Sequence, residues 1–528
     1  MGNGTRPITG ANLIAGSESA QGPASFQAHH PATGENGTVA FSDATGEEIA
    51  AAVESATTAF QEYRSWSSAR VAELLRAAAD EVEALGDQLY EVADAETGLG
   101  RPRLETERAR TCGQLRAFAA HVESGSHVEA IIDHADPDAT PPRPDLRRMR
   151  VALGPVAVFG ASNFPLAFGV PGGDTCSALA AGCPVVIKAH PSHPGTSELC
   201  ARALISAAER VGAPAGIVSM VHGRGPDVGR ALVLAEGIRA VGFTGSFQAG
   251  RALYDLAAGR PHPIPVFAEM GSVNPLFVTQ RALRSRGAQI AQGFAASMTM
   301  GTGQFCTKPG LAFVPTGDDA EAFVGAVADA LRDVGAGVML NAGIRDALVE
   351  RLAHTRAITG VQDVLTPANS DGDGVRCAPS LLAVEWDTFV ANPELGEEHF
   401  GPVAIVVRYH QGQLPDALAG VDGTLSISVH GEDADLDDLL AVRDRMVERA
   451  GRVVWNGFPT GVAVAAAQHH GGPYPATTDP RHTSVGITAI DRFLRPVAFQ
   501  DAPDALLPSA LREDNPLGIR RLVDGAWR

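Results

Sequence analysis

Cys306 lies in a setting that suits a nucleophile. It ends the run GTGQFC (residues 301–306), which follows a helical pattern. A thiolate on a glycine-rich turn can be approached closely by a substrate and by backbone N–H donors. The same segment also fits a buried cysteine that acts only as a small hydrophobic residue, so this alternative stays open here.

Two further residues could act as the base of such a reaction. Glu269 ends an apolar strand predicted over residues 265–268. The carboxyl ends of buried parallel strands are where α/β proteins place their active sites. Capping of a neighbouring helix is the alternative role for this glutamate. His470 precedes a Gly-Gly turn and is a second candidate base, with a purely structural histidine as the alternative.

Other segments could bind a phosphorylated ligand. The turn TGS (residues 244–246) follows a predicted strand and begins a predicted helix, so its glycine lets a phosphate approach the amino end of the helix. Lys188 ends another predicted strand. Of 42 lysine and arginine residues, only Lys188 and Lys308 are lysines, which indicates that a compact charge is needed there. Asn163, within an apolar run, supplies a neutral hydrogen-bond donor or stabilises a turn.

The elements that must position these residues follow an alternating pattern. Short β-rich runs at 156–159, 184–187, 218–221 and 239–243 alternate with helical patterns. This alternation predicts a parallel sheet with helices on both faces. It resumes after residue 270, with a helix over 284–300, a strand over 311–314 and a helix over 320–334, which predicts a second α/β domain. The segments 133–150 and 496–528 are proline-rich and are predicted to be an excursion and an arm.

Composition narrows the classes of function. The chain has 528 residues, of which 45% are hydrophobic and 20% charged, and its net charge is −19. Such a charge repels phosphate backbones and anionic lipids, so we expect no nucleic-acid or membrane partner. The six cysteines lack C-x-x-C spacing, so neither a disulfide framework nor a metal site is expected. No signal peptide is recognisable, and we expect a cytoplasmic protein.

Taken together, these segments resemble the aldehyde dehydrogenase superfamily over nearly the whole chain. The matching motifs are ASNFP (161–165), FTGS (243–246), EMG (269–271), GQFC (303–306) and EEHFGP (397–402). The segments KAHPSHP (188–194) and HGGPYPATTD (470–479) are most similar to the subgroup of NADP-dependent α-ketoglutaric semialdehyde (2,5-dioxovalerate) dehydrogenases. The order and spacing of the motifs are specific together, although each alone is not.

The resemblance implies a covalent mechanism. Cys306 would attack the aldehyde carbon, and the Asn163 side chain with the Cys306 backbone N–H would bind the resulting oxyanion. Hydride transfer to the nicotinamide would leave a thioester on Cys306. Glu269 would then activate the hydrolytic water, with His470 as the fallback base.

The resemblance also implies the cofactor contacts. It assigns Lys188 and Glu398 to the two riboses, Phe400 to the nicotinamide ribose, and Ser246, with Gly245 and Thr244 of the same turn, to the pyrophosphate. NAD-preferring relatives usually carry a glutamate where this chain has Pro191. We therefore expect NADP, with NAD as the alternative. Arg224, in a loop after the next strand, is the predicted partner of the 2′-phosphate.

The expected fold is α/β, with two parallel-sheet domains and a small oligomerisation arm. Residues 1–132 and 151–271 are predicted to form the NADP-binding domain, 272–475 the catalytic domain, and 133–150 with 496–528 the oligomerisation contact of a homodimer or homotetramer. The expected reaction is oxidation of α-ketoglutaric semialdehyde to 2-oxoglutarate. Succinic semialdehyde or a medium-chain aldehyde remains an alternative substrate. A thioester hydrolase or acyltransferase using Cys306 is a second class, and a non-catalytic relative would be expected to lack Cys306 or Glu269.

Overall fold

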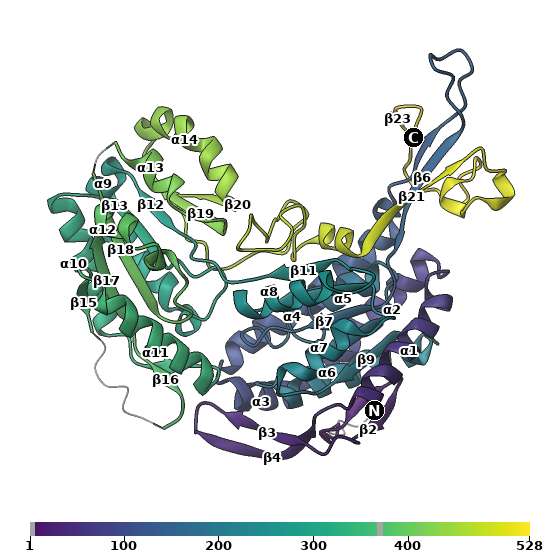
Figure 1. Ribbon diagram of the computed structural model, residues 1–528, viewed down its shortest axis with the longest axis horizontal. Helices are drawn as coiled ribbons and strands as arrows, with labels where there is room; N and C mark the ends of the chain where they lie inside the picture. Colours follow the sequence, from purple (N-terminus) through teal and green to yellow (C-terminus); the bar gives the residue numbers. More distant parts are fainter. Residues whose placement is uncertain (1–5, 367–372, 411) are drawn as a thin grey trace.

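The computed structural model describes residues 6–366, 373–410 and 412–528. Within these ranges the larger sheets are two of seven strands and one of five. Figure 1 shows two α/β bodies side by side and the five-stranded sheet projecting from them as an arm. No helix in the described part of the chain has both the length and the apolar character needed to cross a membrane.

The first sheet has the strand order β11-β10-β7-β8-β9-β1-β2. Strands β7 to β11 run parallel, and β1 and β2 extend the sheet in antiparallel pairing. The strand bounds are β1 (Asn12–Ile14), β2 (Ser17–Ser19), β7 (Val156–Phe159), β8 (Val185–Lys188), β9 (Val218–Val221), β10 (Ala240–Thr244) and β11 (Val266–Glu269). Strands β7 to β11 lie within a residue of the runs predicted from the sequence, whereas β1 and β2 were not predicted.

Helices cover both faces of this sheet because successive strand residues point to opposite sides. Val156 and Val158 pack into one core with α2 (Ser68–Ala84), α4 (Arg101–Glu123), α5 (Gly173–Ala180) and α6 (Pro194–Arg210). Ala157 and Phe159 pack into another with α1 (Gly46–Tyr63), α7 (Pro226–Leu234) and α8 (Phe247–Ala258). The predicted α/β arrangement is thereby confirmed.

The second sheet has the order β15-β17-β18-β13-β12-β19-β20, and only β15 is antiparallel to its neighbour. Its strands are β12 (Leu276–Val278), β13 (Leu311–Pro315), β15 (Gln362–Leu365), β17 (Ser380–Glu385), β18 (Val403–Tyr409), β19 (Thr424–His430) and β20 (Ala450–Trp455). One face packs on α9 (Gln280–Thr299) and α10 (Asp318–Arg332), and the other on α11 (Ala342–Ala357), α12 (Trp386–Ala391) and α14 (Leu436–Arg449).

Helix α9 begins four residues before its predicted start. Thr279 caps it, with a side chain that accepts a hydrogen bond from the backbone N–H of Ala282. The apolar periodicity alone did not reveal this cap, because the residues that follow Thr279 include several arginines on the solvent side. The prediction of a start at Arg284 was therefore wrong by one turn.

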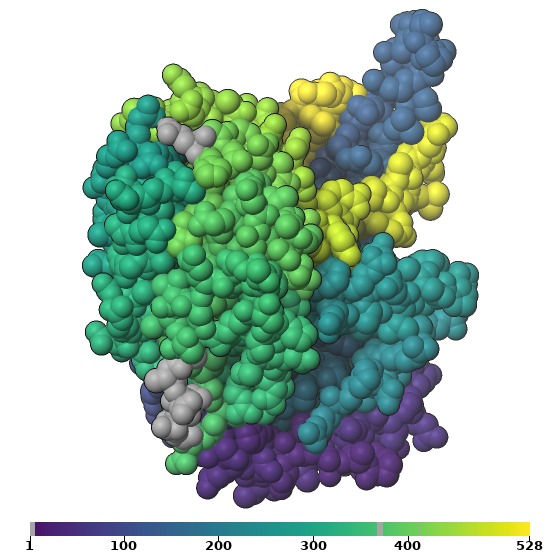
Figure 2. Space-filling model, turned by 60° about the vertical axis from the view of Figure 1, so that its left-hand side comes forward, coloured from purple at the N-terminus to yellow at the C-terminus, as the bar shows by residue number. Residues whose placement is uncertain are grey.

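The arm is a five-stranded sheet of order β21-β6-β5-β22-β23. Its bounds are β5 (Ile131–Asp133), β6 (Leu146–Ala152), β21 (Leu494–Gln500), β22 (Leu522–Val523) and β23 (Ala526–Trp527). Figure 1 shows β6 and β21 rising together from the body, with the carboxyl end of the chain beside them. Figure 2 shows the two bodies from another side, with a hollow between the green and the teal surfaces and the purple amino-terminal residues beneath.

Between β20 and β21 the chain returns from the second body to the first. Residues 456–493 make this return, and a buried ion pair anchors its far end: Arg492 Nη1 lies 2.7 Å from Asp174 Oδ1 on α5. Arg492 Nη2 also donates to the hydroxyl of Ser177 at 3.0 Å. Because the return crosses the end of β11, its anchoring also fixes the residues that it carries over the site.

We predict that Arg492→Met destabilises the fold markedly. The substitution leaves the Asp174 carboxylate buried without its partner, a loss of about 3–5 kcal/mol for a buried pair. The midpoint of urea unfolding should therefore fall. Arg481→Met is the matched control, because its pair with Asp479 has an arginine that is 79% exposed and contributes about 0–1 kcal/mol. Equal midpoints for the two variants would contradict the anchoring role.

Candidate active site

The predicted site residues converge at the carboxyl edge of the first sheet, facing the second body. Strand β11 ends at Glu269, β10 at Thr244 and β8 at Lys188, and β7 precedes the loop of Asn163. Cys306 belongs to the second body and lies on the turn after α9. A cavity of about 410 Å³ lies between these elements. Its lining includes Asn163, Thr244, Gly245, Ser246, Glu269, Cys306, Glu398 and Phe400.

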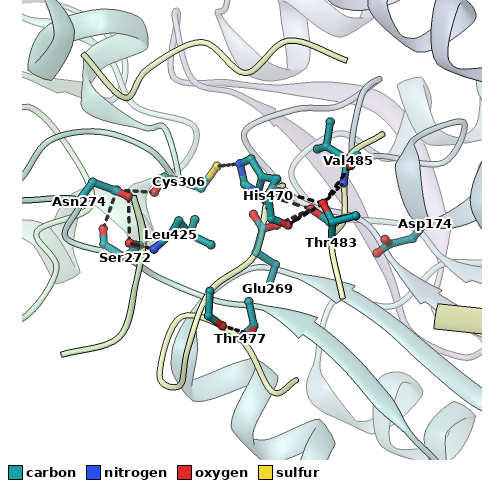
Figure 3. A network of polar contacts seen from close by, with 12 residues as sticks. Asp174, Glu269, Ser272, Asn274, Cys306, Leu425, His470, Thr477, Thr483 and Val485 are labelled. Carbon is teal, nitrogen blue, oxygen red and sulfur yellow. Dashed lines mark hydrogen bonds and ion pairs between the residues drawn. The ribbon is translucent and has the colours of Figure 1, made fainter. Parts of the chain in front are cut away.

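Cys306, His470 and Glu269 form a hydrogen-bonded chain. Cys306 Sγ lies 3.5 Å from His470 Nε2, and His470 Nδ1 lies 2.6 Å from Glu269 Oε2. The hydroxyl of Ser484 donates to the same carboxylate oxygen. Figure 3 shows the imidazole of His470 between the sulfur and the carboxylate. The structure thus places both candidate bases in direct contact, in line with the nucleophile.

The environment keeps His470 protonated at neutral pH. Burial disfavours its cation, but the charges of Glu269 and Cys306 on either side outweigh burial and raise the pKa of His470 to about 10. Since this value lies above the ordinary one near 6.5, the electrostatic stabilisation is present at neutral pH and is lost as the pH rises through about 10. The imidazolium lies within hydrogen-bond reach of the Cys306 sulfur.

Two neighbouring segments hold His470 in place. Its backbone N–H donates to Thr483 Oγ1 at 2.8 Å, and its carbonyl accepts from the backbone N–H of Ser484 at 2.8 Å. On the carboxylate side, the backbone N–H of Met270 donates to the carbonyl of Ala476 at 2.8 Å. The backbone N–H of Thr478 donates to the carbonyl of Ala268 at 3.1 Å, so the return is hydrogen-bonded to the chain on both sides of Glu269. Figure 3 shows Glu269 and His470 at this contact.

Asn274 fixes the backbone of the nucleophile. Its side-chain amide donates to the carbonyls of Cys306 at 2.7 Å and Lys308 at 3.1 Å, and its oxygen accepts from Ser272 and Ser426. Asn274 itself has a φ of +46°, a conformation that asparagine tolerates better than most residues. This residue lies outside the motifs that carried the resemblance, and the sequence analysis did not single it out.

Asn163 lies beside the nucleophile, as the resemblance implied. It is buried, and its side-chain amide donates to the carbonyl of Gln304 at 2.9 Å. An amide nitrogen carries two hydrogens, so one remains for an oxyanion. The backbone carbonyl of Asn163 accepts from Arg103 Nη2 at 2.6 Å, a contact from helix α4 that the sequence analysis did not anticipate.

The TGS turn has the geometry of a phosphate site. Ser246 caps α8, with its side chain accepting from the backbone N–H of Ala249, so it orients the amino end of that helix. The hydroxyl oxygen of Thr244 is buried and has no hydrogen-bond partner among the described residues. The backbone N–H of Gly245 donates to the carbonyl of Glu269 at 3.1 Å, which ties the turn to β11. The free N–H groups of a capped helix end are suited to an anion.

A second cavity, of about 960 Å³, adjoins this turn. Lys188, Pro191 and Arg224 line it, together with Arg230, which the sequence analysis did not single out. Burial lowers the pKa of Lys188 to about 8, with the charge of Asp43 acting against it. Arg224 is exposed, and its backbone N–H donates to Asp43 Oδ1 at 2.9 Å. The two cavities together offer a basic end and a phosphate turn that fit a dinucleotide.

Glu398 shares its surroundings with the second lysine of the chain. Its Oε1 atom is buried and has no hydrogen-bond partner in the described ranges, and a Cβ on Gly271 would overlap its Oε2 atom. Burial raises the pKa of Glu398, and the charge of Lys308 opposes this rise. Lys308 donates to the carbonyls of His399 at 2.8 Å and Val403 at 2.7 Å, so it fixes the loop of Glu398 just before β18.

The arrangement of Cys306, His470 and Glu269 differs from a metal centre, although possible ligand atoms of all three lie within 4.8 Å of one another. The two nitrogens of His470 face different partners, Nε2 the sulfur and Nδ1 the carboxylate. The three side chains therefore form a linear chain of proton donors and acceptors instead of converging on one point, as ligands of a zinc ion must.

The comparisons with known proteins agree with this site. The model of the Aldehyde dehydrogenase family matches residues 18–483. Alpha-ketoglutaric semialdehyde dehydrogenase 2 of Azospirillum brasilense is 47% identical, over 98% of this chain and 99% of that protein. Alpha-ketoglutaric semialdehyde dehydrogenase of Acinetobacter baylyi is 43% identical, over 92% of each. A crystal structure of a mutant Aldehyde Dehydrogenase C from Pseudomonas syringae, in complex with NAD+ and octanal, covers 95% of this chain and 99% of its own, with a TM-score of 0.80 and 21% identity.

We predict that His470→Gln slows alkylation of Cys306 by iodoacetamide at pH 7. The substitution removes the positive charge beside the sulfur. If this charge stabilises the reacting sulfur by about 1.4 kcal/mol, its loss makes the alkylation tenfold slower. Mass spectrometry of the alkylated peptide gives the rate at Cys306 itself. His469→Gln, at the neighbouring histidine, is the control and should react like the unmodified protein. Equal rates in all three proteins would show that His470 does not activate the sulfur.

Proposed function

We propose a function for this chain on the premise that it belongs to the aldehyde dehydrogenase family. The chain oxidises α-ketoglutaric semialdehyde to 2-oxoglutarate, with NADP+ as the oxidant. The substrate is supported by the two relatives at 47% and 43% identity, whose names state this semialdehyde. The chemistry is carried by one observation, the chain of contacts from Cys306 through His470 to Glu269 beside a dinucleotide-sized cleft.

Acylation begins at the sulfur. The Cys306 thiolate, stabilised by the His470 imidazolium, attacks the aldehyde carbon and forms a tetrahedral alkoxide. The free N–H of the Asn163 amide and the backbone N–H of Cys306 stabilise this oxyanion. The nicotinamide supplies a hydride acceptor when the cofactor is bound, and loss of the hydride from the former aldehyde carbon leaves a thioester on Cys306.

Deacylation needs a base for water, and Glu269 has an oxygen free for it. Its Oε2 atom accepts from His470 and Ser484, whereas its Oε1 atom is buried without a partner among the described residues. Oε1 is therefore the acceptor that we assign to the proton of the hydrolytic water. His470 then acts chiefly on the sulfur, and Glu269 remains the base of the second half-reaction.

A thioester hydrolase would use the same three residues, but it would have no use for a dinucleotide site. The capped amino end of α8, the unpartnered hydroxyl of Thr244 and the unpartnered carboxylate oxygen of Glu398 all border the cleft. Because these groups fit a dinucleotide and serve no step of thioester hydrolysis, we favour the dehydrogenase.

The choice of NADP over NAD rests on the basic end of the larger cavity. Lys188, Arg224 and Arg230 line it, and Pro191 offers no carboxylate to a ribose. Asp227 and Asp255 also line this cavity, but Asp255 pairs with Arg251. The carboxylate of Asp43 accepts from the backbone N–H of Arg224. The three basic side chains and the lack of a carboxylate at position 191 support a ligand with an additional 2′-phosphate.

We also propose that the chain works as a cytoplasmic homodimer or homotetramer joined through its arm. The five-stranded sheet of the arm stands apart from both bodies (Figure 1). Leu506 and Trp527, both in its carboxyl-terminal part, are 73% and 57% exposed. A second copy would cover such side chains and the edge of β21. All six cysteines are free thiols, which supports a reducing compartment.

We predict that Glu269→Gln retains the first turnover and loses the later ones. Hydride transfer precedes the step that needs a base, so a burst of NADPH equal to the enzyme concentration should be followed by a steady rate that is lower by about two orders of magnitude or more. Stopped-flow absorbance at 340 nm records both phases. Cys306→Ala is the control and should show neither phase, since it lacks the nucleophile. Absence of the burst in Glu269→Gln would place Glu269 in the first half-reaction.

The cofactor assignment has its own test. The unmodified protein should prefer NADP over NAD, and both Arg224→Ala and Pro191→Glu should erode that preference, by roughly tenfold or more for a lost charge-assisted hydrogen bond. The measurement is kcat/KM for each cofactor at a fixed aldehyde concentration. If the unmodified protein prefers NAD, the proposed choice of NADP is wrong. If Arg224→Ala keeps the same ratio of kcat/KM for NADP to that for NAD, Arg230 becomes the proposed partner of the 2′-phosphate.

A further inference from the structure

We propose that Arg103 and Arg110, on one face of helix α4, form the subsite that binds the carboxylate at the far end of the aldehyde substrate. This inference rests on the proposed function, since it names the residues that would distinguish a semialdehyde acid from an uncharged aldehyde. The chain has 42 lysine and arginine residues, so the sequence offers no means of choosing among them. The structure places these two against aromatic rings that adjoin Cys306 and His470.

The helix brings both side chains to the same side. They are seven residues apart, which is about two turns and about 10 Å along the axis, so they project from one face of α4. Glu107 lies between them on that face and is buried. Its Oε1 atom accepts from the backbone N–H groups of Leu166 and Ala167, in the loop that follows Asn163. This contact docks α4 against the wall of the site.

Arg103 reaches the immediate neighbourhood of the nucleophile. Its guanidinium carbon lies 4.6 Å from the ring centre of Phe305, the residue before Cys306, and 4.8 Å from that of Phe164. Its Nη2 atom donates to the carbonyl of Asn163. A Cβ at position 301 would lie 2.6 Å from Arg103 Nη1, so Gly301 leaves the room that the guanidinium occupies.

Arg110 contacts a neighbouring ring of the same aromatic cluster. Its guanidinium carbon is 5.2 Å from the ring centre of Phe168, and that ring lies 6.1 Å from the imidazole of His470. The rings of Phe164 and Phe168 are 5.6 Å apart, so the two arginines lie against adjoining rings. Aromatic walls with cationic groups at their edges suit an acyl chain that ends in a carboxylate.

Each guanidinium has a nitrogen that no protein group satisfies. The Nη1 atoms of Arg103 and Arg110 are buried and have no hydrogen-bond partner among the described residues. A buried donor without a partner is costly, and for a cation the cost is larger. A carboxylate ligand would supply the missing acceptors with charge-assisted bonds. Binding of the carboxylate to the two guanidinium groups would therefore remove the free-energy cost of their unpaired N–H donors.

The charges also match a monoanion. Glu107 faces both arginines but forms no ion pair within 4.0 Å with either in the described structure. Two guanidinium groups and one carboxylate leave a single net positive charge on this face. α-Ketoglutaric semialdehyde carries one carboxylate, which neutralises it. Two other arginines near Cys306 are weaker candidates: Arg452 already donates to the carbonyl of Pro459, and Arg351 pairs with Glu397.

The test compares a charged with an uncharged substrate of equal length. kcat/KM is measured for α-ketoglutaric semialdehyde and for pentanal with the full-length enzyme, with Arg103→Met, Arg110→Met and the double variant. Arg108→Met is the matched control, because that arginine is on the same helix but lies over Tyr90. Thermal midpoints check folding, and Arg103→Lys and Arg110→Lys test for partial rescue by charge.

We expect each single Met variant to lose roughly 10- to 100-fold in kcat/KM for the semialdehyde, the worth of a charge-assisted hydrogen bond, while the value for pentanal changes little. The Lys variants should recover part of the loss, and Arg108→Met should behave like the unmodified enzyme. Equal losses for both substrates, or none for the semialdehyde, would overturn the proposal.

Glutarate, which has the carboxylate but no aldehyde, separates this inference from the proposed function. If the unmodified enzyme does not prefer the semialdehyde to pentanal, the proposed substrate is wrong. Competitive inhibition of pentanal oxidation by glutarate, weakened at least tenfold in the double variant, would then still support a carboxylate subsite at Arg103 and Arg110. Inhibition that is absent, or equal in the double variant and the unmodified enzyme, would overturn the subsite.

Discussion

The contact between His470 and Glu269 is the interaction on which the rest of the site depends. It joins the carboxyl end of β11 to a segment two hundred residues later, at 2.6 Å and out of contact with bulk water. The imidazole could not face both the carboxylate and the sulfur unless the return of residues 456–493 were held against the first sheet. The backbone bonds around Ala476 and Thr483 and the buried ion pair of Arg492 provide that constraint.

This constraint matters because the residues of the site come from both bodies. The first sheet positions Glu269, the turn of residues 244–246 and Asn163, all at the carboxyl ends of its parallel strands, and the proposed function assigns to them the base, the phosphate turn and the oxyanion donor. The second supplies the nucleophile and Glu398. Neither body holds a complete site, so catalysis requires that their relative placement be fixed. Asn274 and Lys308, both buried at the start of the second body, fix the turn of Cys306 and the loop of Glu398.

Several buried polar atoms around the site have no hydrogen-bond partner within the described chain. They are Glu269 Oε1, Thr244 Oγ1, Glu398 Oε1, Arg103 Nη1 and Arg110 Nη1, and Glu107 Oε2 on the same helix as the two arginines. Buried polar groups are usually satisfied, so unsatisfied ones need an explanation. In the functions proposed above, water, the cofactor and the charged end of the substrate would be the partners of the first five atoms. The burial of these unpaired polar groups costs free energy in the free protein. Because the ligands would supply the missing hydrogen bonds, this cost favours the binding of water, cofactor and substrate together.

The amino-acid sequence by itself determined the α/β class, the strand and helix order and the nucleophile, because these depend on local periodicity and on short motifs. The strands at 156–159 and 218–221 and the turn at 244–246 fall where the pattern places them. Only the tertiary structure decided that His470 bridges Cys306 and Glu269 and that Ser246 caps a helix. It also placed Arg103 and Arg110, out of 42 lysine and arginine residues, against aromatic rings beside Cys306 and His470. These roles arise from contacts between elements far apart in the chain, and no local pattern encodes the direction in which a side chain meets a distant one. Pairing across a sequence separation of 201 residues, as between Glu269 and His470, exists only once both sheets have formed.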